Sequence, residues 1–148
     1  MKKKRNGAPK KQWQDHYTRR ARKEKYPARS VYKLQEMQQK YKIVSKGHRV
    51  LDLGCAPGSW LLFAAEQTGP GGAVIGIDLQ KIDIHLPPQA QVVQADITDT
   101  ASGWLDKIGL EFDAVISDMA PATTGNKAVD AARSFDLCRV ALDIAILA

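Results

Sequence analysis

The sequence predicts an α/β fold with a doubly wound, mostly parallel sheet, and three observations support this prediction. Four short runs rich in Val and Ile lie between residues 48 and 117, as is typical of buried strands. Segments with helical periodicity separate and follow these runs. With 148 residues, 44% of them apolar, the chain has the size and composition of about one globular domain. This composition argues against a disordered chain or a membrane span.

The elements follow from local patterns. Leu34, Met37 and Tyr41 share one helical face, which predicts a helix near residues 30–44 with Ser30 as its N-cap. The apolar runs predict strands, and the segments between them predict helices. The predicted strands are His48–Leu53, Ala73–Ile77, Gln91–Ala95 and Phe112–Ser117, and the predicted helices between them are Ser59–Thr68 and Thr100–Ile108.

A last helix is predicted from Val129 to the end of the sequence. Its apolar residues recur with a helical period, and Ala148 follows with neither a cap nor a polar tail. A four-stranded parallel sheet would also leave its last strand as a bare apolar edge. We therefore expect a domain that is truncated after its fourth strand and the following helix.

The net charge of +6 is distributed unevenly. Residues 1–50 hold 17 of the 22 basic residues and three of the 16 acidic ones, a net +14, whereas residues 51–148 carry −8. This asymmetry indicates a segment that binds a polyanion, with nucleic acid the first candidate and an anionic membrane surface the second. We expect a basic, partly mobile RNA-binding arm over residues 1–28 and a domain over residues 29–148. Trp13, Tyr17 and Tyr26 would stack on unpaired bases, unless the arm only solubilises the chain.

The first residues and the cysteines indicate the compartment. No apolar run follows the charged start, and the start is Lys-dominated with Gly7 and Pro9, unlike a secretory or mitochondrial signal. Cys55 and Cys138 are too few and too far apart for a disulfide framework or a metal site. We therefore expect a cytoplasmic protein with reduced thiols and no bound metal.

Acidic residues stand where the predicted strands end. Asp78, Asp96 and Asp118 end or follow the second, third and fourth strands, and Asp52 lies one residue before the end of the first. In open α/β sheets, ligands bind beyond the carboxyl ends of the strands. If these acids did no more than end the strands, their presence at three strand ends would be a coincidence. We therefore expect a binding site at this edge.

A glycine-containing turn follows the first strand. Gly54 and Gly58 allow a ligand close to the backbone, and Ser59 is expected to cap the next helix. The spacing is G-x-x-x-G and not the dinucleotide fingerprint, which disfavours a nicotinamide-dependent oxidoreductase without excluding it. Asp78 would accept hydrogen bonds from ribose hydroxyls, and Asp96 from an adenine amine. Together these features suggest an adenosine cofactor without phosphates.

Three motifs resemble those of S-adenosylmethionine-dependent methyltransferases, and specifically the FtsJ (RrmJ-type) ribosomal RNA ribose 2′-O-methyltransferases. The motifs are Ser30–Leu34, Asp52–Trp60 and Ser117–Pro121, in a resemblance that extends from about Lys10 to Ala148. It implies a Rossmann-like methyltransferase fold, of which residues 29–148 form the N-terminal part. It also implies S-adenosylmethionine as cofactor, and methylation of a ribose 2′-hydroxyl, of a uridine, in large-subunit ribosomal RNA. The cofactor-binding residues implied are Gly54, Gly58, Trp60, Asp78, Asp96 and Asp118.

The family uses a Lys-Asp-Lys-Glu tetrad, of which this sequence contains half. Lys33 matches the first lysine and Asp118 the aspartate, whereas the second lysine, held to be the general base, and the glutamate would follow Ala148. A 2′-hydroxyl is a weak acid that needs a positioned base and aligned reactants. Lys33 would be the cation that lowers the pKa of the base lysine, and Asp118 would orient Lys33 and the hydroxyl. An inactive fragment, or a module that binds RNA or S-adenosylmethionine without turnover, therefore stays an alternative.

The residues after Asp118 bear on the methyl acceptor. Enzymes that methylate amino groups resemble one another in an aromatic residue after the proline, and cytosine C5 enzymes place Cys there; this chain has Ala122 after Pro121. With amino groups and cytosine C5 disfavoured, we interpret the methyl acceptor as a hydroxyl group. Lys127 does not match the family's second lysine. The partner we expect is ribosomal RNA in the large subunit, with no membrane association, for a protein that is a monomer when whole.

Overall fold

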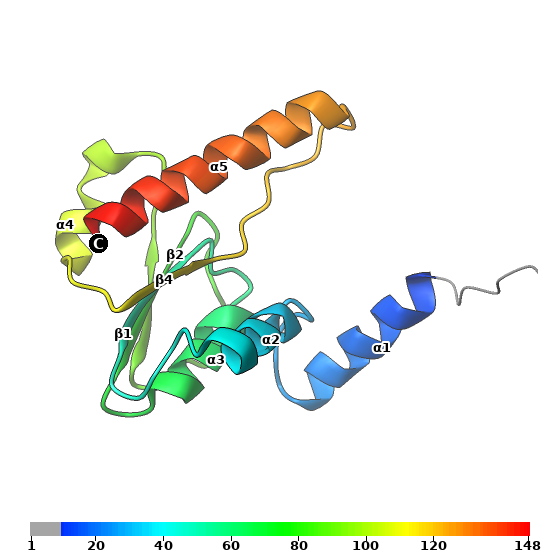
Figure 1. Ribbon diagram of the computed structural model, residues 1–148, viewed down its shortest axis with the longest axis horizontal. Helices are drawn as coiled ribbons and strands as arrows, with labels where there is room; N and C mark the ends of the chain where they lie inside the picture. The colour runs from blue at the N-terminus through cyan, green and yellow to red at the C-terminus, as the bar shows by residue number, and fades with distance from the viewer. Residues whose placement is uncertain (1–9) are drawn as a thin grey trace, which may run out of the picture.

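The fold is a four-stranded parallel sheet covered by helices on both faces (Figure 1). The computed structural model describes residues 10–148, with side chains from residue 14 onward, so the predicted stacking role of Trp13 falls outside the described side chains. The strand order is β3-β2-β1-β4, and this confirms the predicted parallel α/β sheet. The elements are α1 (Lys10–Lys23), α2 (Val31–Tyr41), β1 (Arg49–Leu53), α3 (Ser59–Thr68), β2 (Ala73–Asp78), β3 (Ala90–Gln94), the 3₁₀ turn η1 (Thr100–Ser102), α4 (Trp104–Ile108), β4 (Ala114–Ser117) and α5 (Lys127–Leu147).

The strands divide the core into two layers. Successive side chains of a strand point to opposite faces, so Val50 packs with α2 and α3 while the next residue, Leu51, packs with α4 and α5. Val74 and Ile75 of β2 divide in the same way. Figure 1 shows α2 and α3 on one side of the sheet and α4 and α5 on the other. Because both faces are covered, the strands read as continuous apolar runs.

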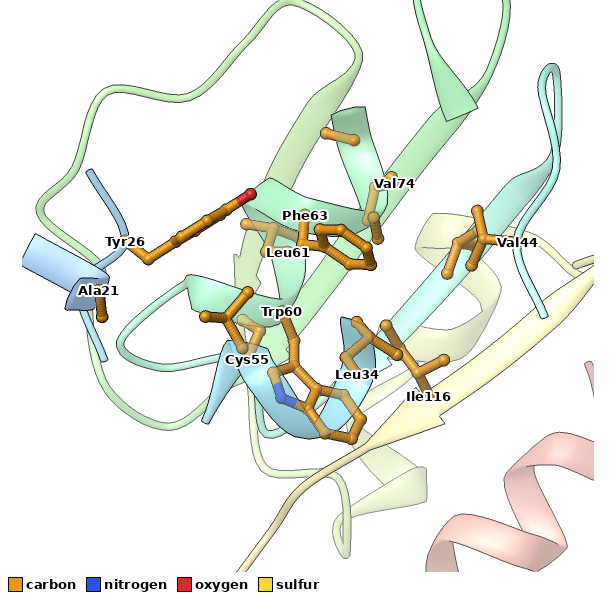
Figure 2. Packing of buried hydrophobic residues seen from close by; sticks show 14 residues of the cluster. Ala21, Tyr26, Leu34, Val44, Cys55, Trp60, Leu61, Phe63, Val74 and Ile116 are labelled. Atoms are coloured by element: carbon orange, nitrogen blue, oxygen red, sulfur yellow. The ribbon is translucent and has the colours of Figure 1, made fainter. Parts of the chain in front are cut away.

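The layer on the α2 and α3 side is shown in Figure 2. Leu34 of α2 is fully buried and lies beside Trp60 of α3 and Ile116 of β4. The Trp60 indole Nε1 donates a hydrogen bond of 2.9 Å to the Ser30 carbonyl oxygen, at the N-terminus of α2. This bond satisfies a buried polar group and joins the two helices.

Of the two predicted helix caps, Ser59 is wrong and Ser30 is confirmed in its position. Gly58, not Ser59, is the N-cap of α3, and Ser59 is its first helical residue. The Ser59 hydroxyl instead accepts a hydrogen bond of 2.7 Å from the backbone N–H of Ala28. Ser30 does occupy the N-cap position of α2, but its side chain makes no capping bond. At Ser59, a contact with a distant segment therefore replaces the predicted local cap.

Part of the N-terminal segment packs against the domain. A helix, α1, covers half of the segment expected to be a mobile arm, and its residue Ala21 is buried in the core. Tyr26 is also buried, and its hydroxyl donates to the Glu66 carboxylate at 2.6 Å. The prediction that Tyr26 stacks on bases is therefore wrong, and Figure 2 shows it inside the cluster with Ala21. The boundary expected at residue 28 is crossed by core contacts.

The C-terminal half differs from the sequence prediction in one element. Gly103, with φ of +70°, divides the helix expected over residues 100–108 into η1 and α4. Asn126 caps α5 by accepting from the N–H groups of Ala128 and Val129. Ile144 is the buried residue of α5, whereas several of its large apolar side chains are exposed. Among the described helices, none is long and apolar enough to cross a membrane.

The buried Tyr26 generates a stability prediction. Tyr26→Ala is expected to lower the free energy of unfolding by about 3 kcal/mol, because it removes a packed ring and the bond to Glu66. Tyr41→Ala is the matched control: that ring is 62% exposed, and the change should stay within about 0.5 kcal/mol. Urea unfolding followed by circular dichroism measures both. Equal stability of the two variants would show that the N-terminal segment is not part of the folded core.

Candidate functional site

A cavity of about 680 Å³ lies beyond the carboxyl ends of the strands. Four of the residues predicted to bind a cofactor line it, namely Gly54, Asp78, Asp96 and Asp118. The four come from the loops after β1, β2, β3 and β4, which the parallel sheet brings to one edge. This is the place at which open α/β sheets bind ligands.

The turn after β1 forms one wall of the cavity. The backbone N–H groups of Gly54 and Cys55 both donate to the Ile77 carbonyl oxygen, at 2.8 and 3.2 Å, and so extend the pairing of β1 with β2 into the turn. Gly54 has φ of +74°, and a Cβ there would collide with the Met119 side chain. The position therefore requires glycine both for its backbone conformation and for the close approach of Met119.

Asp78 connects two walls of the cavity. Its Oδ2 accepts from the Ala56 N–H at 2.9 Å, and its Oδ1 accepts from the Gln80 N–H at 2.8 Å. Each bond uses one acceptor site of an oxygen that has two. The carboxylate is thus held in place by the backbone while it keeps acceptor capacity for a ligand.

Asp96 is an ionised carboxylate on the opposite wall. Its Oδ1 accepts from the Thr98 hydroxyl at 2.6 Å and from the Thr98 N–H at 2.8 Å. These two bonds lower the pKa of the Asp96 carboxyl. The other oxygen, Oδ2, has no hydrogen-bond partner in the described part of the chain, so it is free to accept from a ligand.

Lys33 and Asp118 meet at the rim of the cavity. The Lys33 Nζ lies 2.9 Å from Asp118 Oδ1, although the two residues are 85 positions apart in the sequence. The side chains are 67% and 32% exposed, and ion pairs at this exposure contribute little to stability. The pair brings together the two residues that match the first half of the family's tetrad.

Gly58 and Trp60, also predicted at the cofactor, are not among the residues that line this cavity. Gly58 has φ of +109°, and a Cβ there would collide with the Ile84 side chain from the loop after β2. Trp60 is buried, with the indole bonded to the start of α2. Because α2 carries Lys33, Trp60 contacts the helix that positions Lys33 instead of the cavity.

Asp52 is an acidic residue behind the cavity that the sequence analysis placed on the strand but did not select. It is 1% exposed, and its Oδ2 has no hydrogen-bond partner. Burial raises the pKa of the Asp52 carboxyl to about 8, and the charges of Asp78 and Asp118 add to this effect. An acidic residue inside an apolar strand was the signal available in the sequence. Among the described residues, no group of three His, Cys, Asp or Glu side chains is placed to hold a metal ion.

Comparison with known proteins identifies the family. The family model of FtsJ-like methyltransferases matches residues 26–148. The chain belongs to this family. The match includes α2 with Lys33 and all four strands that form the cavity.

Individual relatives agree with this assignment. The ribosomal RNA large subunit methyltransferase E of Desulforapulum autotrophicum is 59% identical over 138 residues, which are 93% of this chain and 68% of that protein. The protein of the same name from Desulfatibacillum aliphaticivorans is 52% identical and is covered over 70% of its length. A crystal structure of a protein named as a ribosomal RNA methyltransferase, from Plasmodium falciparum, has a TM-score of 0.65 at 32% identity, covering 81% of this chain and 69% of that one. The chain therefore spans about two thirds of the length of these relatives.

The buried Asp52 generates a prediction of pH dependence. The pKa of Asp52 is higher in the folded than in the unfolded chain, so folding retains a proton that the unfolded chain releases. The free energy of unfolding should therefore fall as the pH rises from about 4 to about 8, by several kcal/mol from this group. Asp52→Asn removes the titration, and its stability relative to the parent chain should increase over this range.

Urea unfolding at pH 5 and at pH 8.5 measures this difference. Asp99→Asn is the control, because Asp99 is exposed and the exchange should change stability by less than about 0.5 kcal/mol at either pH. A difference between Asp52→Asn and the parent chain that is the same at both pH values would contradict the prediction.

Proposed function

We propose that the cavity and the Lys33–Asp118 pair serve S-adenosylmethionine-dependent methylation of a ribose 2′-hydroxyl in large-subunit ribosomal RNA. The observation that carries the proposal is the Lys33–Asp118 ion pair at the rim of a cavity lined by Asp78 and Asp96. The relatives of the chain, named for methylation of large-subunit ribosomal RNA, support the class of substrate. The choice of uridine rests on the family resemblance.

The residues of the cavity fit the proposed cofactor. The backbone-held Asp78 has acceptor sites left for the two ribose hydroxyls, and the free Oδ2 of Asp96 suits the adenine amine. Asp78, Asp96 and Asp118 also make the lining of the cavity acidic. S-adenosylmethionine carries a positively charged sulfonium and an ammonium group, and when bound it supplies the methyl group. An acidic cavity favours such a cation.

Lys33 and Asp118 are proposed to position the acceptor. Asp118 contacts both the cavity and the Lys33 ammonium, so a hydroxyl placed beside it lies between the cofactor cavity and a fixed cation. Ala120, Pro121 and Ala122 line the same end of the cavity and offer no aromatic face for a planar base. This lining favours a hydroxyl acceptor over the amino group of a base.

The general base is the part of the mechanism that these residues do not supply. Lys33 is paired with a carboxylate as a cation, and the residues of this sequence that match the tetrad are Lys33 and Asp118 alone. This supports the second candidate, a chain that binds the cofactor and RNA without turnover. The two candidates differ in methyl transfer and agree in cofactor binding.

Cofactor binding tests what both candidates share. Asp78→Ala is expected to abolish the binding of S-adenosylmethionine measured by isothermal titration calorimetry, because it removes the ribose acceptor and the link between two walls of the cavity. Asp83→Ala, an exposed carboxylate in the same loop, should bind as the parent chain does. Unchanged affinity in Asp78→Ala would refute the assignment of the cavity to this cofactor.

Turnover separates the two candidates. With tritiated S-adenosylmethionine and large ribosomal subunits that lack the modification, the 148-residue chain is expected to transfer no label, because no base is matched beside Lys33. Cofactor binding should persist in the same preparation. Label transferred to RNA by this chain would show that the base lies within its own residues.

A further inference from the structure

A second hollow lies between α1 and α2, apart from the cofactor cavity. It has a volume of about 750 Å³, and we call it the α1–α2 groove. None of its lining residues is aliphatic: they are amide, hydroxyl, aromatic and charged side chains. The residues that matter for its chemistry are Tyr17, Arg20, Arg29, Tyr32, Lys33 and Glu36.

The groove and the cofactor cavity meet at the Lys33–Asp118 pair. Lys33 lines the groove, Asp118 lines the cavity, and their charged groups are 2.9 Å apart. A chain-like ligand lying in the groove therefore reaches the rim of the cavity at the two residues proposed to position the acceptor. A ligand longer than one nucleotide can occupy both sites at once.

The groove is lined by three basic residues. Arg20, Arg29 and Lys33 line it together with Glu36, and two of them are paired, Arg20 with Glu24 and Lys33 with Asp118. In the described part of the chain, Arg29 makes no ion pair, so its guanidinium is available to a phosphate. A phosphate chain is the ligand that such a lining favours.

Planar groups gather in the same groove. The Arg20 guanidinium lies over the Tyr32 ring at 4.6 Å from its centroid, and the Tyr17 ring, tilted by 49°, has its centroid 5.4 Å from that of Tyr32. Glu24 fixes this arrangement, because its carboxylate accepts from Arg20 at 2.7 Å and from the Tyr32 hydroxyl at 3.0 Å. Unpaired bases stack on aromatic rings and on arginine planes.

We propose that the α1–α2 groove binds an unpaired nucleotide next to the one that is methylated, with its base on the Tyr17–Arg20–Tyr32 stack and its phosphate on Arg29. This proposal rests on the proposed function and adds a second site to it. A lipid surface carries phosphates too, but the groove is concave and has no aliphatic side chain to enter a membrane. A single-stranded RNA supplies both the phosphate and the planar base.

The test compares two fluorescein-labelled RNA strands of eight nucleotides by fluorescence anisotropy, one an oligouridylate and one with the same backbone but no bases. Tyr17→Ala and Arg20→Lys remove the planar surface and keep the charge of the groove. Each is expected to weaken binding of the oligouridylate by about 5-fold to 100-fold and to leave binding of the strand without bases unchanged. Tyr17 is exposed, so its replacement should preserve the fold, which circular dichroism checks.

Arg29→Gln tests the phosphate contact. It is expected to weaken binding of both strands and to reduce the slope of log affinity against log salt by about 0.7. Lys107→Gln is the matched control, since it removes one positive charge from α4 on the opposite face of the sheet and should change neither. Equal effects of Arg29→Gln and Lys107→Gln would overturn the assignment of the phosphate to the groove.

The remaining outcomes are distinct. If Tyr17→Ala and Arg20→Lys bind both strands as the parent chain does, or lose affinity for both equally, the stacking site is overturned while the proposed function stands. If the parent chain binds S-adenosylmethionine but no RNA, then RNA is not its substrate, and both the proposed function and the groove proposal are refuted. Binding to vesicles of phosphatidylglycerol and phosphatidylcholine in place of RNA would refute both in the same way. Loss of affinity confined to the base-bearing strand establishes the groove.

Discussion

The parallel register of three strands is the constraint on which the site depends. Leu53 of β1 pairs with Ile77 of β2 and with Ser117 of β4, so these three strands end at one level. The next residues along β2 and β4 are Asp78 and Asp118, and the turn with Gly54 follows β1. Three loops distant in sequence therefore form one cavity without any direct bond among the acids. A slip of one residue would turn these side chains to the other face of the sheet.

Gathering acids at one edge has an energetic consequence. Asp52 is buried behind Asp78 and Asp118, and the repulsion among them adds to the cost of burying its charge. Among the described residues, the basic partner of these acids is Lys33, which lies at the rim and is mostly exposed, so an ion pair relieves little of this cost. A cationic ligand would relieve part of this cost, which is a physical reason for the cavity to favour such a ligand over an anionic one.

Much of the molecule was predictable because its signals are local. The apolar runs identified all four strands to within two residues at each end, since a strand buried on both faces needs an uninterrupted apolar sequence. The ends of the strands then identified Asp78, Asp96 and Asp118. The role of Ser59 and the burial of Tyr26 were not predictable, because partners far along the chain determine them: the Ala28 N–H donates to the Ser59 hydroxyl, and the Tyr26 hydroxyl donates to Glu66.

The sequence by itself determined the fold class, the edge of the sheet at which the cavity lies and the residues that match the family's motifs. These depend on period, spacing and residue type, which local chemistry dictates. Only the tertiary structure decided that Lys33 reaches Asp118, that Trp60 supports α2 instead of lining the cavity, and that Tyr17, Arg20 and Tyr32 form one stack. The physical reason is that each of these contacts joins elements whose relative placement follows from how the helices pack on the sheet, and no local pattern records that packing.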